Sequence, residues 1–151
     1  MTIKTFQDLV DYYRTTPQFL SLRNRTQRDY DYCINRAVET FFSPKVTMGR
    51  TILGKIGVSE CKKAYQQWLN RGIRTANMTA TVSSVLFNTA VELELIPNNP
   101  MKHVTKMQTQ PRKVMWREDQ VRLFLDTAYG EYKWRSIGLI VHMAYSFAQR
   151  I

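Results

Sequence analysis

The chain is poor in cysteine and lacks the signals of secretion or membrane insertion. Its 151 residues include two cysteines, Cys33 and Cys61, and both fall on the apolar side of a helical pattern. That placement favours reduced core thiols over a disulfide framework. The N-terminus, MTIKTFQDLV, lacks the charged-then-apolar layout of a signal peptide. The apolar run from Ile137 to Ile151 is too short to span a bilayer and carries histidine, glutamine and arginine. We therefore expect a soluble, intracellular protein.

The sequence also lacks the common motifs of cofactor-dependent enzymes. It contains no GxGxxG, no P-loop and no GxSxG. Its two histidines, His103 and His142, have no second histidine, cysteine or carboxylate at the spacing of metal ligands. We therefore expect neither a metal ion nor another cofactor. The length suits one large domain or two small ones.

Acidic residues are scarce relative to basic ones. The chain holds 22 Lys and Arg against 12 Asp and Glu, a net charge of +10. This charge favours a polyanionic partner. It is densest in residues 101–115, MKHVTKMQTQPRKVM, which hold 4 basic and no acidic residues. This stretch shows neither helical nor strand periodicity and includes Pro111, so the pattern predicts a basic linker.

Apolar residues recur with helical spacing in four segments before this linker and in two after it. Each of the first four segments begins near a residue that can cap a helix and ends near a proline or glycine. They run from Thr5 to Pro17, from Thr26 to Pro44 with Phe41 in the apolar stripe, from Ser59 to Gly72, and from Thr75 to Pro97. Residues 45–58 predict a loop with a short extended piece. The predicted fold is all-α, with a four-helix domain over 1–100, the linker over 101–115, and two helices over 116–151 that are separated at Gly130.

One face of the fourth helix carries uncharged hydrogen-bonding side chains. These are Asn77, Thr81, Ser84 and Asn88, spaced 4, 3 and 4 residues apart, and Arg71 and Arg74 precede them. Arginines that hold phosphates beside Asn, Ser and Thr that reach base edges would suit a DNA groove. A solvated helix face of this composition is the alternative interpretation of the same pattern.

Two further clusters of basic residues are candidates for contact with DNA phosphates. Arg23, Arg25 and Arg28 precede or open the second helix, where Asp29 and Asp31 offset part of their charge. The linker adds Lys102, Lys106, Arg112 and Lys113. We therefore predict that the DNA-binding residues lie in these clusters and at the start of the fourth helix.

Three segments together resemble the N-terminal part of a tyrosine recombinase, a phage-type integrase. LELIPNNP resembles the end of the core-binding domain, a compact (SAM-like) helical DNA clamp, and WREDQVRLFLDTA resembles the helix that opens the catalytic domain. GLIVHMAYSFAQRI resembles the next helix, which ends in the first catalytic arginine at the position of Arg150. Many family members have a glycine before that arginine, whereas this chain reads Phe147, Ala148 and Gln149.

The resemblance implies a function for the whole protein and a role for Arg150. The family cuts one DNA strand by tyrosine attack, and the arginine stabilises the charge of the pentacoordinate transition state. The tyrosine and the other catalytic groups would lie downstream. We therefore expect a fragment that binds attachment-site duplex DNA without cutting it, and a tetramer on DNA when the protein is full length, in the cytoplasm of a bacterial host. The alternatives are a non-enzymatic basic helical regulator that binds DNA and a helical RNA-binding protein.

Overall fold

The structure, a computed structural model, describes residues 3–109 and 116–147 of the chain. The chain divides into two compact units, residues 1–109 and 110–151.

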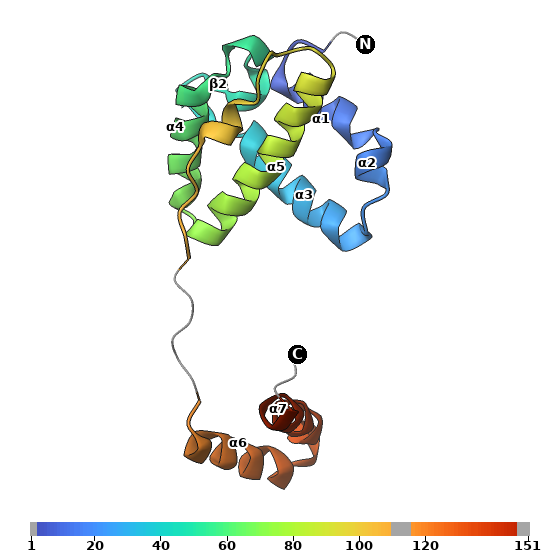
Figure 1. Cartoon of the computed structure of the whole chain (residues 1–151), viewed down its shortest axis with the longest axis vertical. Helices are drawn as coiled ribbons and strands as arrows, with labels where there is room; N and C mark the ends of the chain where they lie inside the picture. The colour runs from blue at the N-terminus through green and yellow to red at the C-terminus, as the bar shows by residue number, and fades with distance from the viewer. Residues whose placement is uncertain (1–2, 110–115, 148–151) are drawn as a thin grey trace. The chain divides into compact units, whose positions relative to one another are not determined.

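Four helices build the N-terminal unit, and a fifth, short helix joins the first two of them (Figure 1). They are α1 Phe6–Arg14, α2 Pro17–Leu20, α3 Asn24–Val38, α4 Val58–Leu69 and α5 Ile73–Glu92. The predicted all-α class and the four predicted helices are confirmed, with shifted ends. The expected role of Pro17 was wrong, because α1 already ends at Arg14 and Pro17 is the first residue of α2, capped by Thr16. Proline suits that first position, where its missing N–H is not needed.

A short β-hairpin follows α3 and corrects the prediction for Phe41. Strands β1 Phe41–Ser43 and β2 Val46–Thr47 pair antiparallel, and the Phe41 side chain is 56% exposed rather than part of a buried helical stripe. After α3 ends at Val38, Thr40 is held by two residues far away in the chain. Its carbonyl accepts from the Met48 amide at 2.7 Å, and its hydroxyl accepts from the indole N–H of Trp68 at 2.7 Å. Two 3₁₀ turns, η1 Met48–Arg50 and η2 Leu53–Lys55, lead on to α4.

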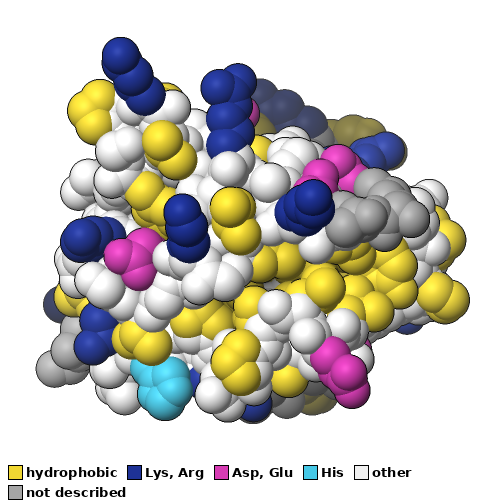
Figure 2. Space-filling view, turned by 90° about the horizontal axis from the view of Figure 1, so that it is seen from above, with side chains coloured by type: hydrophobic (Ala, Val, Ile, Leu, Met, Phe, Trp, Pro, Cys, Tyr) yellow, Lys and Arg dark blue, Asp and Glu magenta, His cyan; other side chains and the backbone are white. Residues whose placement is uncertain are grey.

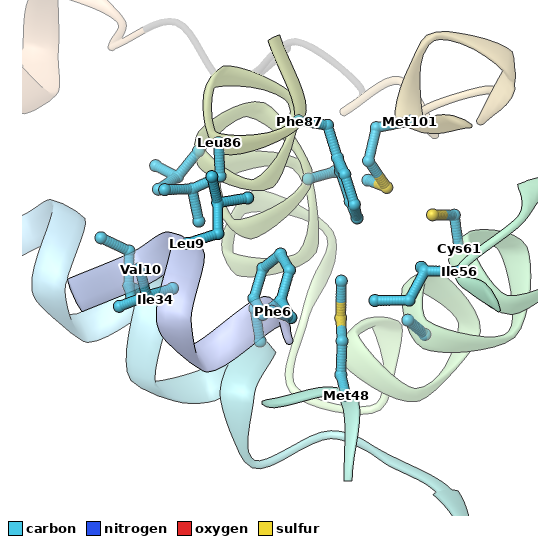
Figure 3. Packing of buried hydrophobic residues seen from close by; sticks show 14 of the residues in the cluster. Phe6, Leu9, Val10, Ile34, Met48, Ile56, Cys61, Leu86, Phe87 and Met101 are labelled. Carbon is cyan, nitrogen blue, oxygen red and sulfur yellow. The ribbon is translucent and has the colours of Figure 1, made fainter. Parts of the chain in front are cut away.

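The core of the N-terminal unit is built from the apolar faces of its helices and from the turns between them. Phe6, Leu9, Leu86 and Phe87 are fully buried, and Figure 3 shows side chains from α1, α3, α5 and the turns pointing toward one another. The two cysteines, Cys33 and Cys61, are unpaired and buried, as predicted.

The segment after α5 is packed on the unit, which corrects the expectation of a linker from residue 101 onward. Helix α5 ends at Glu92, and a 3₁₀ turn, η3 Pro100–His103, packs against α4 and α5. Met101 and Val104 are buried in the core, and Figure 3 shows Met101 beside Phe87 and Cys61. The sequence did not predict this packing, because two apolar residues three positions apart are too few to indicate a buried face within a basic stretch.

In the described part of the C-terminal unit, residues 116–147, the two predicted helices are present and are joined by a 3₁₀ turn. Its elements are α6 Glu118–Gly130, η4 Tyr132–Trp134 and α7 Arg135–Phe147. The helices touch at Gly138, where an added Cβ would lie 3.0 Å from the Cβ of Ala128. Much of the apolar surface of α7 is exposed, including Leu139, Ile140 and Met143. Within the described residues, none of the helices combines the length and the hydropathy that a membrane span needs.

Candidate nucleic-acid interface

Helices α3 and α5 both begin at one edge of the N-terminal unit, the lower edge in Figure 1. Neither start is capped by a side chain, since Arg23 at the N-cap of α3 makes no cap hydrogen bond and Gly72 at the N-cap of α5 has no side chain. Neither helix has an acidic residue in its first turn. Helices α1 and α4 differ, because Asp8 and Glu60 accept hydrogen bonds from the backbone at their starts.

Arginines occupy the place that acidic residues take at other helix starts. Five exposed arginines lie at or near these two starts, and we call them the arginine edge: Arg23, Arg25, Arg28, Arg71 and Arg74. A helix N-terminus carries a partial positive charge, so cations there are locally unfavourable. An anion bound between the helix amides and the guanidinium groups would reverse the sign of that interaction. The arrangement therefore suits phosphate groups.

The arginine edge is not neutralised by nearby carboxylates. In the described part of the chain, none of its five guanidinium groups lies within 4.0 Å of an acidic side chain. Asp31, which the sequence suggested as a partial offset, instead accepts from Nε of Arg14 at 3.0 Å. The positive charge of the edge is thus available to an external partner.

Gly72 shapes the turn that carries two of these arginines. Its φ is +106°, a backbone conformation that other residues rarely adopt, and its amide donates to the Leu69 carbonyl at 2.9 Å. The third predicted helix ends before this glycine, as expected, but α4 ends at Leu69 with Asn70 as its cap, and Gly72 is the N-cap of α5. The sharp turn sets Arg71 and Arg74 on either side of the start of α5.

The polar stripe of α5 has partners within the chain. Asn77 accepts from the Tyr65 hydroxyl at 2.6 Å and donates to the Met107 carbonyl at 2.8 Å. Asn99 donates to the carbonyl and hydroxyl of Ser84, and Nζ of Lys106 donates to the Thr81 hydroxyl at 2.7 Å. These hydrogen bonds hold residues 99–107 along the helix. The stripe therefore has a structural role that its sequence pattern does not indicate, because hydrogen-bonding side chains can bind a chain segment as well as a base edge.

Of the remaining residues predicted to bind DNA or to act in catalysis, some are exposed and others lie outside the described residues. Lys102 and Lys106 are exposed on the packed segment. Arg112, Lys113 and the predicted catalytic arginine, Arg150, lie outside the described residues. Within the described residues, no three His, Cys, Asp or Glu side chains gather as metal ligands would.

Basic side chains also occur away from the arginine edge. Figure 2, seen from above, shows Lys and Arg side chains separated from one another by hydrophobic and uncharged surface. A cavity of about 790 Å³ next to the edge is lined by Arg36, Glu39 and, from the arginine edge itself, Arg71. The Arg36 guanidinium lies 4.6 Å from the Tyr32 ring centre. That cavity adjoins the C-terminal ends of α3 and α4, where helix dipoles disfavour anions. The arginine edge is the better candidate for phosphates.

Comparison with known proteins gives matches at the level of structure. No protein-family model matches the sequence, and no curated protein matches it. Solved complexes of the Tn1549 transposon integrase with circular intermediate DNA superpose on 98% of this chain, with a TM-score of 0.74 and 18% identity. The fold is that of a tyrosine recombinase. The resemblance predicted from sequence is confirmed at this level.

The similarity has a defined extent. This chain spans 46–47% of the length of the matched integrase chains, for complexes with three different circular intermediate DNAs. At 18% identity the match shows the tyrosine recombinase fold, and the assignment of individual contacts depends on the geometry of this chain.

Proposed function

We propose that the N-terminal unit binds duplex DNA through the arginine edge, as the DNA-binding part of a tyrosine recombinase integrase. The observation that carries the proposal is the shared fold over 98% of the chain with integrases in complex with DNA. The chemistry of the arginine edge supports it independently, because two uncapped helix starts and five exposed arginines suit a phosphate backbone.

The proposed contacts are of two kinds. Guanidinium forks of Arg23, Arg25, Arg28, Arg71 and Arg74 and the first amides of α3 and α5 hold phosphate oxygens. Lys102, Lys106, Arg112 and Lys113 extend the positive charge along the connection to the second unit. Asn77, Thr81 and Ser84 act indirectly, because they hold the segment that carries Lys102 and Lys106.

The finer proposal is site-specific recombination by the full-length protein of a phage or prophage. The Arg150 guanidinium would contact the scissile phosphate and stabilise the transition state. A tyrosine elsewhere in the protein would form a 3′-phosphotyrosyl link. The DNA would be an attachment site, the active species a tetramer, and the setting the bacterial cytoplasm. This chemistry uses no metal ion.

Duplex binding and its salt dependence test the proposed interface. Each neutralised phosphate contributes about −0.9 to the slope of log K against log salt concentration. Arg74→Ala should therefore weaken binding at low salt and make the slope about one unit less steep. Arg50→Ala, an exposed arginine on η1, is the matched control and should change neither quantity. Equal effects of the two substitutions would place the interface elsewhere.

A cleavage assay separates the recombinase from a basic regulator that only binds DNA. In the full-length protein, Arg150→Ala should abolish strand cleavage and leave duplex binding nearly unchanged, because the arginine acts on charge that develops in the transition state. Normal cleavage by that variant would show that the proposed role of Arg150 is wrong.

A further inference from the structure

Residues 99–107, which we call the strap, run along α4 and α5 toward the arginine edge (Figure 1). Asn99 fixes the beginning of the strap and is 4% exposed. Its Nδ2 donates to the Ser84 carbonyl at 2.9 Å, to the Ser84 hydroxyl at 3.0 Å and to Oδ1 of Asn88 at 2.7 Å. Its Oδ1 accepts from the Met101 amide at 2.9 Å. A buried amide with this many partners has one orientation available.

Apolar packing and a lysine hold the middle of the strap. Met101 and Val104 are 3% and 7% exposed and belong to the core of the unit. Val104 and Thr105 line a small cleft of about 180 Å³ together with Lys62 and Tyr65 of α4. Lys106 is exposed, yet its ammonium contacts Thr81 of α5. An ammonium has three donors, so this contact leaves Lys106 able to bind a phosphate as well.

Three residues form a closed ring of hydrogen bonds at the end of the strap, which we call the latch. The Met107 amide donates to the Tyr65 hydroxyl at 2.7 Å, and that hydroxyl donates to Oδ1 of Asn77 at 2.6 Å. Nδ2 of Asn77 completes the ring by donating to the Met107 carbonyl at 2.8 Å. Tyr65 is 2% exposed, so the two hydrogen bonds of its hydroxyl are partly shielded from water and thereby strengthened, whereas the Asn77–Met107 hydrogen bond is exposed.

We propose that Tyr65 and Asn77 are positioning residues that fix the end of the strap beside the arginine edge, so that Lys106 and the arginines act as one DNA-binding surface. Asn77 lies three residues after Arg74, on the same face of α5, so the latch and Arg74 are neighbours. A lysine on a fixed backbone loses less conformational entropy on binding than a lysine on a moving one. This inference rests on the proposed function.

Amide hydrogen exchange tests the latch without DNA. Tyr65→Phe removes one hydroxyl, so the Met107 amide should exchange about two- to tenfold faster, as expected for the loss of one neutral hydrogen bond. Tyr30→Phe is the matched control, because the Tyr30 side chain is partly buried and makes no hydrogen bond among the described residues. Asn77→Ala provides a second variant should Tyr65→Phe fail to fold. Unchanged exchange at Met107 in a folded variant would overturn the latch.

A double-mutant cycle on duplex DNA tests the positioning role. Lys106→Met should weaken binding about three- to tenfold in the otherwise unchanged chain and less than about twofold in the Tyr65→Phe background, because an unlatched lysine contributes little. A purely structural tyrosine would leave the effect of Lys106→Met the same in both backgrounds, and that result would overturn the proposal. Absence of duplex binding by the unchanged chain would instead contradict the proposed function, with the exchange result on the latch unaffected.

Discussion

At the scale of single residues, Asn99 is a buried polar side chain that makes four hydrogen bonds within the N-terminal unit. Its amide group hydrogen-bonds to the carbonyl and hydroxyl of Ser84, to the side chain of Asn88 and to the backbone amide of Met101. Asn99→Ala would deprive the buried Met101 amide and the partly buried Ser84 carbonyl and hydroxyl of this partner, so we expect it to lower the free energy of unfolding by about 2 kcal/mol. Urea denaturation measures this loss. Its exposed neighbour gives the control, since Asn98→Ala should change the stability by no more than about 0.5 kcal/mol.

Cys61 gives the molecule a sensitivity to alkaline pH. Burial raises the pKa of this thiol from its ordinary 9.0 to about 12. The unfolded chain therefore loses the proton first, and the stability associated with the neutral thiol is present below pH 9 and is lost as the pH rises toward 12. The free energy of unfolding should fall by up to about 1.4 kcal/mol per pH unit in that window.

Denaturant titrations at several pH values between 8 and about 11 measure this dependence. Cys61→Ala removes the titrating group, so its stability should fall less steeply with pH. Some dependence should remain, because burial also raises the pKa of Cys33. Parallel curves for the two proteins would show that Cys61 does not titrate differently in the folded and unfolded states.

At the scale of elements, α1 owes its start to a reciprocal pair of hydrogen bonds. The Asp8 amide donates to the Thr5 hydroxyl at 3.2 Å, and the Thr5 amide donates to the Asp8 carboxylate at 2.9 Å. The backbone amides of Thr5 and Lys4 lower the pKa of the Asp8 carboxyl. Thr5→Ala should reduce stability by about 1 kcal/mol in a thermal or urea unfolding experiment. Thr105→Ala on the exposed part of the strap should have a much smaller effect.

The elements that sequence could predict are those determined by local signals. Thr5 as a cap, the helical spacing of apolar residues and the glycine at position 72 all act within a few residues of themselves. The hairpin and the strap depend on partners far away in the chain. Thr40 meets Trp68, and Tyr65 meets Met107, at separations of 28 and 42 residues. No pattern within a single helix contains that information.

The candidate site shows the same division. The two clusters of arginines were candidates from sequence alone, and in the structure all five residues are exposed and lie at or near the two uncapped helix starts. The partners of Asn77 and Ser84 were not predictable, because an amide or hydroxyl bonds equally well to a base edge, to water or to the backbone of a distant segment. Only the position of the strap distinguishes these possibilities.

At the scale of the whole molecule, the strap determines where the chain can be truncated without loss of stability in the N-terminal unit. A chain ending at Pro100 would lack Met101 and Val104, and burial of each such side chain is worth about 1.5–3 kcal/mol. We expect a fragment of residues 1–109 to fold cooperatively and to be more stable than a fragment of residues 1–100 by about 3 kcal/mol or more. Equilibrium unfolding of the two fragments measures this difference. Equal stability would mean that the strap contributes nothing to the core.

The strap also limits the length of the connection between the two units. Since the N-terminal unit holds the chain as far as Met107, the connection to the first residue of α6, Glu118, can be at most ~38 Å long, at ~3.5 Å per residue. A connection beginning at Pro100 would reach ~60 Å by the same estimate. The shorter tether is comparable to one helical turn of duplex DNA, ~34–36 Å. If both units engage one duplex, a shorter tether raises the effective concentration of the second unit for that duplex once the first is bound.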